Sequence, residues 1–226
     1  MRIENLGHSC FLIEVKGFKI LLDPFLNENP IAKIKASDVE CDLILVTHGH
    51  GDHVADAEEI AKKNNCPVVA NYEVGNWLTS LGVENVTGMN HGGNYAFDHG
   101  TIKMVNAVHS SSLPDGSYGG NPAGFIIKTP ALNVYFAGDT ALMADMKIFG
   151  EYENIGLSIL PIGDVFTMGV DDAIIAAQML KCKRVIGMHY DSFPPIVIDK
   201  EEAKRKFAEK GCELNLLEIG LNTEFN

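Results

Sequence analysis

The sequence has few basic residues and no long apolar run. Its 226 residues include 18 lysines and arginines against 30 aspartates and glutamates, a formal net charge of −12. Broad binding to a nucleic-acid backbone needs clustered basic side chains, so we expect no nucleic-acid partner. No uninterrupted apolar stretch is long enough to cross a bilayer, and no basic segment followed by an apolar one opens the chain. We therefore expect a cytoplasmic protein without a membrane partner.

Closely spaced cysteine pairs are also absent. The chain has five cysteines, an odd number, and none follows another with the spacing Cys-x-x-Cys. That pattern argues against a disulfide framework and against a zinc ribbon. Several of these cysteines lie in or beside apolar runs, so we expect reduced thiols in the core. They are Cys10, Cys41, Cys66, Cys182 and Cys212.

No low-complexity segment divides the chain. There is no proline-rich, glycine/serine-rich or like-charge run that would indicate a linker. Hydrophobic residues make up 46 % of the sequence, which is enough for a globular core. We therefore expect one domain, residues 1–226.

Apolar and alternating segments predict a protein rich in short strands. Strands are expected at residues 2–5, 10–15, 18–23, 43–46, 66–70, 84–87, 95–98, 101–108, 125–129, 134–137, 156–161, 185–188 and 213–219. Helical patterns follow residue 53, cover 72–81, follow residue 171 and cover 200–210, and a helical turn is expected at 30–35. Periodicity by itself restricts the fold class to α/β or α+β.

What the sequence does contain is four metal-capable side chains within six residues. The strand-like segment 43–46 is followed by His48, His50, Asp52 and His53, which Gly49 and Gly51 separate. Two glycines in so short a loop allow turns in which these side chains converge. A strand before the loop and a helix after it are the context that a metal-binding loop needs. The alternative is a polar loop whose histidines are solvated or cap the helix.

The motif His48-x-His50-x-Asp52-His53 resembles the signature of the metallo-β-lactamase superfamily of binuclear metal hydrolases, and the resemblance covers essentially the whole chain. Gly-His-Ser at residues 7–9 and Phe-Thr-Met-Gly at 166–169 are similar to a prokaryotic branch close to the ascorbate-6-phosphate lactonases. The resemblance implies a four-layer αββα sandwich within the α/β (α+β) class. In such a sandwich two sheets face each other between outer helices, and the active site lies at one edge between the sheets.

Further candidate ligands stand where strand-like segments end. Residues 101–108 lead to His109, residues 134–137 lead to the Gly-Asp-Thr step that contains Asp139, and residues 185–188 lead to His189. The resemblance implies that His48, His50 and His109 bind one metal ion. It implies that Asp52, His53 and His189 bind a second ion, and that Asp139 bridges the two.

Other positions are candidates for supporting roles. Asp23, at the end of a strand-like segment, resembles an aspartate that braces the metal loop, although a turn residue is the alternative. His8, in the Gly-His-Ser turn, is a candidate catalytic residue, with a hydrogen-bonded structural histidine as the alternative. Ser110 and Tyr118 belong to a polar loop, residues 110–123, and are candidate substrate contacts, unless that loop is only a linker. Whether His8 and Asp164 line the site stays open.

The chemistry of these ligands indicates a hydrolase. Imidazoles with a few carboxylates suit zinc, which we expect, and also manganese, iron or nickel. Two divalent ions about 3.5–4 Å apart can bind a bridging hydroxide and polarise a substrate oxygen. The resemblance implies that Asp52 orients or deprotonates that water. We therefore expect a binuclear hydrolase whose partner is a small molecule, namely an ester, a lactone or a phosphorylated sugar derivative.

Three alternatives stay open. They are a phosphodiesterase or nuclease of the same superfamily, an iron redox protein, and a metal-binding protein without catalysis. A local basic patch would favour the nuclease, and the acidic composition disfavours it. A homo-oligomer is also compatible with a chain of this size.

Overall fold

The computed structural model describes residues 1–225. The strands in this part of the chain form two seven-stranded sheets. The first sheet has the order β14 (Asn222–Glu224), β1 (Arg2–Gly7), β2 (Cys10–Val15), β3 (Phe18–Leu22), β4 (Leu43–Leu45), β5 (Val68–Asn71), β6 (Val86–Met89). The second has the order β13 (Glu213–Asn215), β12 (Arg184–Met188), β11 (Leu157–Pro161), β10 (Asn133–Phe136), β9 (Ala123–Lys128), β8 (Gly100–Asn106), β7 (Asn94–Phe97).

Side chains of the first sheet alternate between two apolar environments. In β4, Leu43 and Leu45 belong to the core between the sheets, whereas Ile44 packs with the helices on the outer face. Successive side chains of a strand point to opposite faces, so a continuous apolar run is what a sheet buried on both sides requires. The sequence of β3 and β4 is apolar at nearly every position for this reason.

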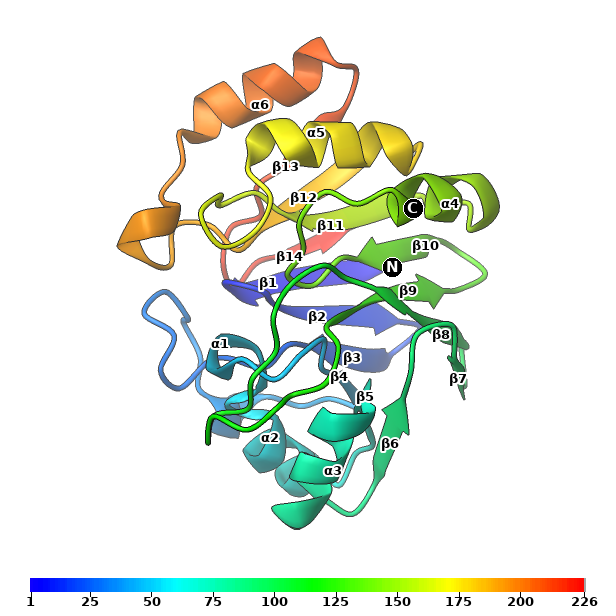
Figure 1. The fold of residues 1–226 in the computed structure, drawn as a ribbon, viewed down its shortest axis with the longest axis vertical. Helices are drawn as coiled ribbons and strands as arrows, with labels where there is room; N and C mark the ends of the chain where they lie inside the picture. Colours follow the sequence, from blue (N-terminus) through cyan, green and yellow to red (C-terminus); the bar gives the residue numbers. More distant parts are fainter. Residues whose placement is uncertain (226) are drawn as a thin grey trace.

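Helices cover the outer faces of both sheets, so the molecule has four layers (Figure 1). On the first sheet lie α1 (Gly51–Val54), α2 (Ala57–Asn64) and α3 (Tyr72–Ser80). On the second lie α4 (Asp145–Tyr152), α5 (Val170–Met179) and α6 (Lys200–Glu209). Two short 3-10 helices, η1 (Ala36–Asp38) and η2 (Pro194–Ile196), belong to connections. This is the αββα sandwich that the resemblance implied, so the predicted fold class is confirmed.

Several strands of each sheet run in the same direction and end at the same edge. In the first sheet, β1 and β3 are both antiparallel to β2, and β4 is parallel to β3. In the second sheet, β8 and β10 are both antiparallel to β9, while β11 and β12 follow the direction of β10. The loops after the carboxyl ends of such strands gather at one place, which is where sites form in sheets of this kind.

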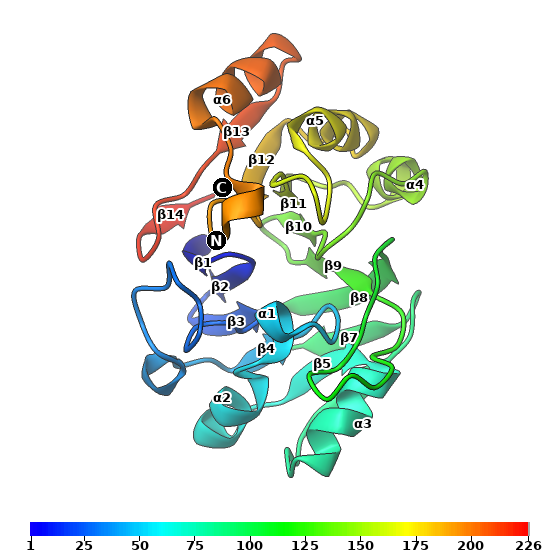
Figure 2. The ribbon, with the colours of Figure 1, turned by 60° about the vertical axis from the view of Figure 1, so that its left-hand side comes forward.

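The beginning of the chain lies beside its end (Figure 2). Strand β14 pairs antiparallel with β1, and the amino group of Met1 donates a hydrogen bond of 3.1 Å to the carbonyl oxygen of Phe225. The last strand therefore covers β1, which would otherwise be an unpaired edge.

The cysteines lie in the core. All five cysteines are buried and free, as predicted, and the sulfurs of Cys41 and Cys66 are 3.7 Å apart. Among residues 1–225, no helix has both the length and the apolar character needed to traverse a bilayer.

Several local predictions differ from the structure. The helical turn expected at residues 30–35 lies instead at η1, where Asp38 accepts a hydrogen bond from the backbone of Lys35. The expected strand 213–219 ends at Asn215, and the helix expected after residue 53 already begins at Gly51. Helix α4 and strand β14 were not predicted.

Candidate metal centre

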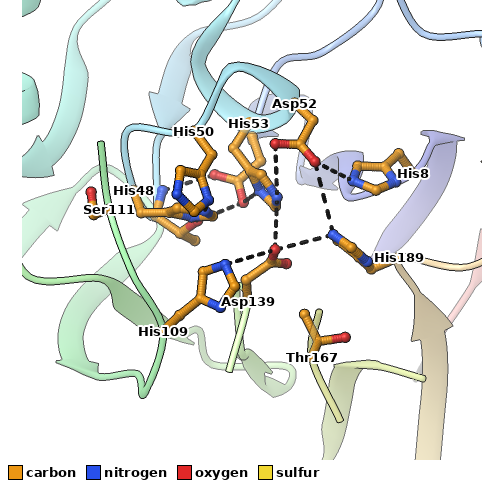
Figure 3. A network of polar contacts seen from close by, with 12 residues as sticks. His8, His48, His50, Asp52, His53, His109, Ser111, Asp139, Thr167 and His189 are labelled. Atoms are coloured by element: carbon orange, nitrogen blue, oxygen red, sulfur yellow. Dashed lines mark hydrogen bonds and ion pairs between the residues drawn. The ribbon is translucent and has the colours of Figure 1, made fainter. Parts of the chain in front are cut away.

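The seven predicted metal ligands come together at the shared edge of the two sheets (Figure 3). The loops after β4, β8, β10 and β12 carry His48, His109, Asp139 and His189 in turn. The remaining ligands, His50, Asp52 and His53, lie at or near the start of α1. Strands that end at one edge thus bring together side chains that are far apart in the sequence.

One carboxylate oxygen stands at the centre of this cluster. Oδ2 of Asp139 is 3.1 Å from Nε2 of His189, 3.2 Å from Nε2 of His53 and 3.5 Å from Nε2 of His109. Asp139 is buried, and its second oxygen, Oδ1, has no hydrogen-bond partner. A buried polar atom without a partner is rare and needs an explanation, and a ligand that binds a cation is one.

The donor atoms form three overlapping groups, and within each group they lie within 4.8 Å of one another. The groups are His48, His50 and His109; His8, Asp52, His53 and His189; and His48, His53 and Asp139. Imidazoles supplemented by carboxylates are suitable ligands for zinc and related divalent ions. The residues therefore fit two neighbouring ions, and the occupation of both positions stays a prediction.

Two side chains orient the histidines of the metal loop. The hydroxyl of Thr47 donates to Oδ2 of Asp23 at 2.7 Å and lies 3.0 Å from Nδ1 of His48, which assigns the Nδ1–H of His48 as the donor to Thr47. Nδ1 of His53 is 2.8 Å from Oδ2 of Asp23 and donates to that carboxylate. In both rings Nε2 is left to face the cluster, where it is free to bind a metal ion.

Asp23 makes the contacts expected of a bracing residue. Besides the two bonds to Oδ2, its Oδ1 accepts a hydrogen bond of 2.8 Å from the backbone N–H of Thr47. The carboxylate is fully buried, so these three donors depend on it and not on water. The backbone of Asp23 is left-handed, with φ of 43°, a conformation that residues other than glycine seldom adopt and that is common at functional sites.

His8 also lies at the cluster, although it lines a different cavity from the one that His50 and His109 line. Its Nε2 is 3.2 Å from Oδ2 of Asp52, its Nδ1 contacts the hydroxyl of Ser192, and its carbonyl accepts a hydrogen bond from the backbone of His189. Burial lowers the pKa of His8 to about 4, so the ring is neutral at pH 7. We assign the serine as donor to Nδ1 and the Nε2–H as donor to Asp52.

The metal-free protein should lose stability in acid. Histidine in an unfolded chain has a pKa of about 6.5. Below that pH the unfolded chain takes up a proton that folded His8, with its pKa lowered to about 4 by burial, does not. Between pH 6.5 and 4 this residue alone should remove on the order of 3 kcal/mol of unfolding free energy. Burial also lowers the pKa of His48, His50 and His109, so these residues add to the loss of stability in acid.

One histidine opposes this trend. Burial by itself would lower the pKa of His53, but the carboxylates of Asp139 and Asp23 outweigh it and raise the pKa well above its usual value. The stability that His53 contributes is present below pH 6.5 and is lost only as the pH rises through the raised pKa. Urea unfolding of chelator-treated protein at pH 7, 6 and 5 measures the net effect of these histidines on the free energy of unfolding. A His8→Gln variant should give a shallower pH dependence, and an equal slope in both proteins would contradict the role given to His8.

A cavity of about 580 Å³ opens beside the cluster. Its polar lining consists of His50, Asp52, His109, Ser110, Asp139 and His189. Its apolar lining consists of Val165, Phe166, Phe193 and Pro195. A concave site with a few convergent polar groups and an apolar lining is typical of small-molecule binding.

The predicted supporting residues differ in their relation to this cavity. Ser110 lines it, and its hydroxyl is 3.4 Å from Nε2 of His50. Asp164 is not among the lining residues, and it belongs to an adjacent cavity. Tyr118 does not line the cavity either; it is 65 % exposed and donates its hydroxyl proton to Asn121.

Hydrogen bonds from other segments fix the loop that carries Tyr118. The side-chain amide of Asn71 donates to the carbonyl oxygens of Gly119 and Asn121, at 2.8 and 3.0 Å. Ser111 holds the same loop from the other side, since its hydroxyl donates to Gly119 and accepts from the backbone of Gly49. The loop is therefore fastened to the end of β5 and to the metal loop, and Tyr118 points into solvent.

Sequence reasoning missed the residues whose partners are distant in the chain. Ser192 contacts His8 across 184 positions, and no motif surrounds it. Thr47 was not predicted as a site residue, although a hydroxyl directly before the first ligand is a usable signal. The four apolar residues of the cavity were not predicted as site residues.

The chain is similar to known proteins in sequence. A family model described as a beta-lactamase superfamily domain matches residues 2–189. A protein from Methylacidiphilum infernorum (isolate V4), named UPF0173 metal-dependent hydrolase, is 50 % identical over 220 residues, which cover 97 % of each chain.

Solved structures show the same fold. Igni18, described as a novel metallo hydrolase from the archaeon Ignicoccus hospitalis KIN4/I, is 34 % identical with a TM-score of 0.89. The match covers 100 % of this chain and 99 % of that one. An isothiocyanate hydrolase from Delia radicum gut bacteria, 20 % identical with a TM-score of 0.81 and matched over 100 % and 99 % of the two chains, shares the fold.

Proposed function

Because the chain belongs to the β-lactamase superfamily, we propose that it is a metal-dependent hydrolase of small-molecule esters or lactones. One observation carries the proposal. A single buried oxygen, Oδ2 of Asp139, lies 3.1 to 3.5 Å from three imidazole nitrogens and beside a cavity of about 580 Å³. Ligands so placed can hold ions where a substrate has access to them.

Two sets of these ligands would each hold one ion. His48, His50 and His109 would bind the first ion, and Asp52, His53 and His189 the second, with Asp139 shared between them. When bound, divalent ions of this kind supply a Lewis acid and lower the pKa of water to near 7. Zinc fits the donor set best, and the choice among zinc, manganese, iron and nickel needs metal analysis.

Asp52 is the carboxylate best placed to act on a water during hydrolysis. It lines the cavity and accepts the hydrogen bond from Nε2 of His8. Burial would raise its pKa, but the hydrogen bond from His8 and the neighbouring histidines lower the pKa below its usual value. Asp52 is therefore ionised at neutral pH, and it would orient a water or accept its proton. His8, fixed by Ser192, would position this carboxylate.

Ser110 would contact the substrate beside the ligands of the first ion, His48, His50 and His109. Its hydroxyl lies next to His50 in the polar lining of the cavity and has room to donate to a substrate oxygen. The relative from Methylacidiphilum infernorum, which carries the name metal-dependent hydrolase at 50 % identity, supports the reaction class but names no substrate.

The cavity favours a neutral substrate over a phosphodiester or a phosphorylated sugar. Among residues 1–225, those that line it include no lysine or arginine. Phosphate recognition by side chains normally uses those two residues. The formal net charge of −12 disfavours a nucleic-acid substrate as well.

Metal analysis combined with a substrate panel tests the proposal. Protein purified without added metal is analysed for bound ions, and the metal-loaded form is assayed with carboxylic esters, lactones, phosphomonoesters and phosphodiesters. We expect about two divalent ions per chain and turnover of esters or lactones that a chelator abolishes and added metal restores. Turnover that survives complete metal removal would contradict a metal-dependent reaction. A preference for phosphodiesters would favour the second candidate function.

A further inference from the structure

The apolar residues that line the cavity are exposed, except Phe193, which is half-buried. Val165, Phe166, Phe193 and Pro195, hereafter the apolar wall, line the same cavity as the metal ligands. Val165 is 64 % exposed and Phe166 is 52 % exposed. Large apolar side chains that are exposed together, at the rim of a polar site, are characteristic of a binding surface.

The backbone of the wall is held in a conformation that its residues do not prefer. Val165 has a φ of 53°, which is a genuine outlier for a β-branched residue. The carbonyl of Asp164 accepts from the backbone N–H of Phe166, and its side chain accepts from the backbone N–H of Val165 at 2.8 Å. A three-residue turn with a positive φ at its central residue is rare and strained, and such backbone strain is found mainly at functional sites.

The same loop is connected to the metal cluster. The backbone N–H of Met168 donates to the carbonyl of Thr140 at 3.1 Å, and Thr140 directly follows the central ligand Asp139. A bridge between Gly163 and Gly169 closes the loop at its base. The position of Val165 and Phe166 is therefore fixed relative to Asp139.

We propose that the apolar wall binds an apolar alkyl or aryl substituent of the ester or lactone, while the carbonyl group lies over the metal cluster. This inference rests on the proposed function and adds the class of substrate. Continuity identifies the occupant, because the wall and the ligands share one cavity. Val165 and Pro195 also line an adjacent cavity of about 320 Å³, which provides room for a longer substituent. Val165 and Phe166 then determine specificity.

A series of esters tests the wall in the metal-loaded protein. With p-nitrophenyl acetate, butyrate and hexanoate, we expect kcat/KM to rise by about twofold to fourfold for each added methylene, as burial of a CH₂ group predicts. In Phe166→Ala most of this rise should be lost, while Phe166→Leu retains it. Tyr152→Ala, which removes an aromatic ring that is 77 % exposed on α4 outside the cavity, is the matched control and should retain the full rise.

Binding of n-alkanols tests the wall without any reaction. Affinities of butanol, hexanol and octanol are measured by NMR in the metal-free and metal-loaded protein. We expect affinity to increase with chain length, with shifts at Val165 and Phe166, and to fall by about threefold to tenfold in Phe166→Ala. Chain-length dependence that is equal in Phe166→Ala and in the unchanged protein would overturn the proposal.

The ester kinetics and the alkanol binding together distinguish failure of the proposed function from failure of the role given to the apolar wall. Suppose that alkanol binding depends on Phe166 but that the protein hydrolyses no ester. That result would support binding of apolar groups by the apolar wall and would contradict the proposed function. Ester turnover that does not depend on chain length would support the hydrolase function and overturn the proposed role of the apolar wall. If Phe166→Ala instead converts an oligomer into monomers in sedimentation, the wall is an interface with a second copy, and the proposal is wrong.

Discussion

Exchange of Asp139 for asparagine is expected to lower kcat by on the order of a thousandfold and to reduce the bound metal. Oδ2 of Asp139 lies 3.1 to 3.5 Å from three imidazole nitrogens, so an amide at this point removes the negative charge that the cluster shares. A thousandfold loss corresponds to about 4 kcal/mol, a size that is reasonable for a group that holds catalytic ions. Metal content and steady-state kinetics on the best substrate of the panel measure both effects.

Asp172→Asn is the matched control, because it makes the same chemical change on the exposed first turn of α5. It should retain the metal content and kcat of the unchanged protein. Full metal content and full turnover in Asp139→Asn would show that the catalytic centre lies elsewhere.

Removal of the Asp23 carboxylate is expected to have the largest effect on stability. In Asp23→Ala the backbone N–H and hydroxyl of Thr47 and Nδ1 of His53 lose their acceptor in a fully buried place. Leaving buried donors unpaired beside a histidine should cost about 3–5 kcal/mol of unfolding free energy. For a chain of this size, that corresponds to a fall in Tm of about 10 °C. Metal affinity should fall by about 10- to 100-fold, because His53 is no longer oriented.

Urea unfolding and metal titration test this expectation, with Asp42→Ala as control. Asp42 also accepts a backbone hydrogen bond, 2.7 Å from the N–H of Lys19, but it lies at the surface, where water can replace it. Its removal should cost less than about 1 kcal/mol. Equal losses in the two variants would mean that Asp23 does not brace the metal loop.

The metal cluster was accessible to sequence reasoning because its signals are local. Each ligand follows a short strand, and a strand that is buried on both faces has a recognisable apolar run. The motif at residues 48–53 needs no tertiary information, and strands that end at one edge supply the rest. The roles of His109, Asp139 and His189 came from the resemblance, since alternation predicts a strand end but not which strands are neighbours.

The apolar wall and the role of His8 depend on contacts that no local pattern encodes. Val165 is in a left-handed conformation that its side chain disfavours, so its propensity predicts the opposite of what the loop does. His8 is oriented by Ser192, 184 positions away. Tyr118 was misleading for the same reason, because Asn71 fastens its loop from a distant strand.

The missed elements share a physical cause. Strand β14, Asn222–Glu224, has polar side chains and joins the first sheet through main-chain pairing with β1. Helix α4 buries only Met146, so its sequence has no clear apolar stripe. Backbone hydrogen bonds stabilise such elements, and they do not produce a side-chain pattern.

The division of the cluster between the two sheets has a consequence for biosynthesis. The part of the chain up to β4 and α1 supplies His8, Asp23, His48, His50, Asp52 and His53, and the later part supplies His109, Asp139 and His189. A nascent polypeptide that has emerged only as far as α3 thus holds an incomplete set of ligands. The last imidazole of the predicted set is added only when residue 189 leaves the ribosome, so we expect the complete set of donors to form late in the maturation of this protein.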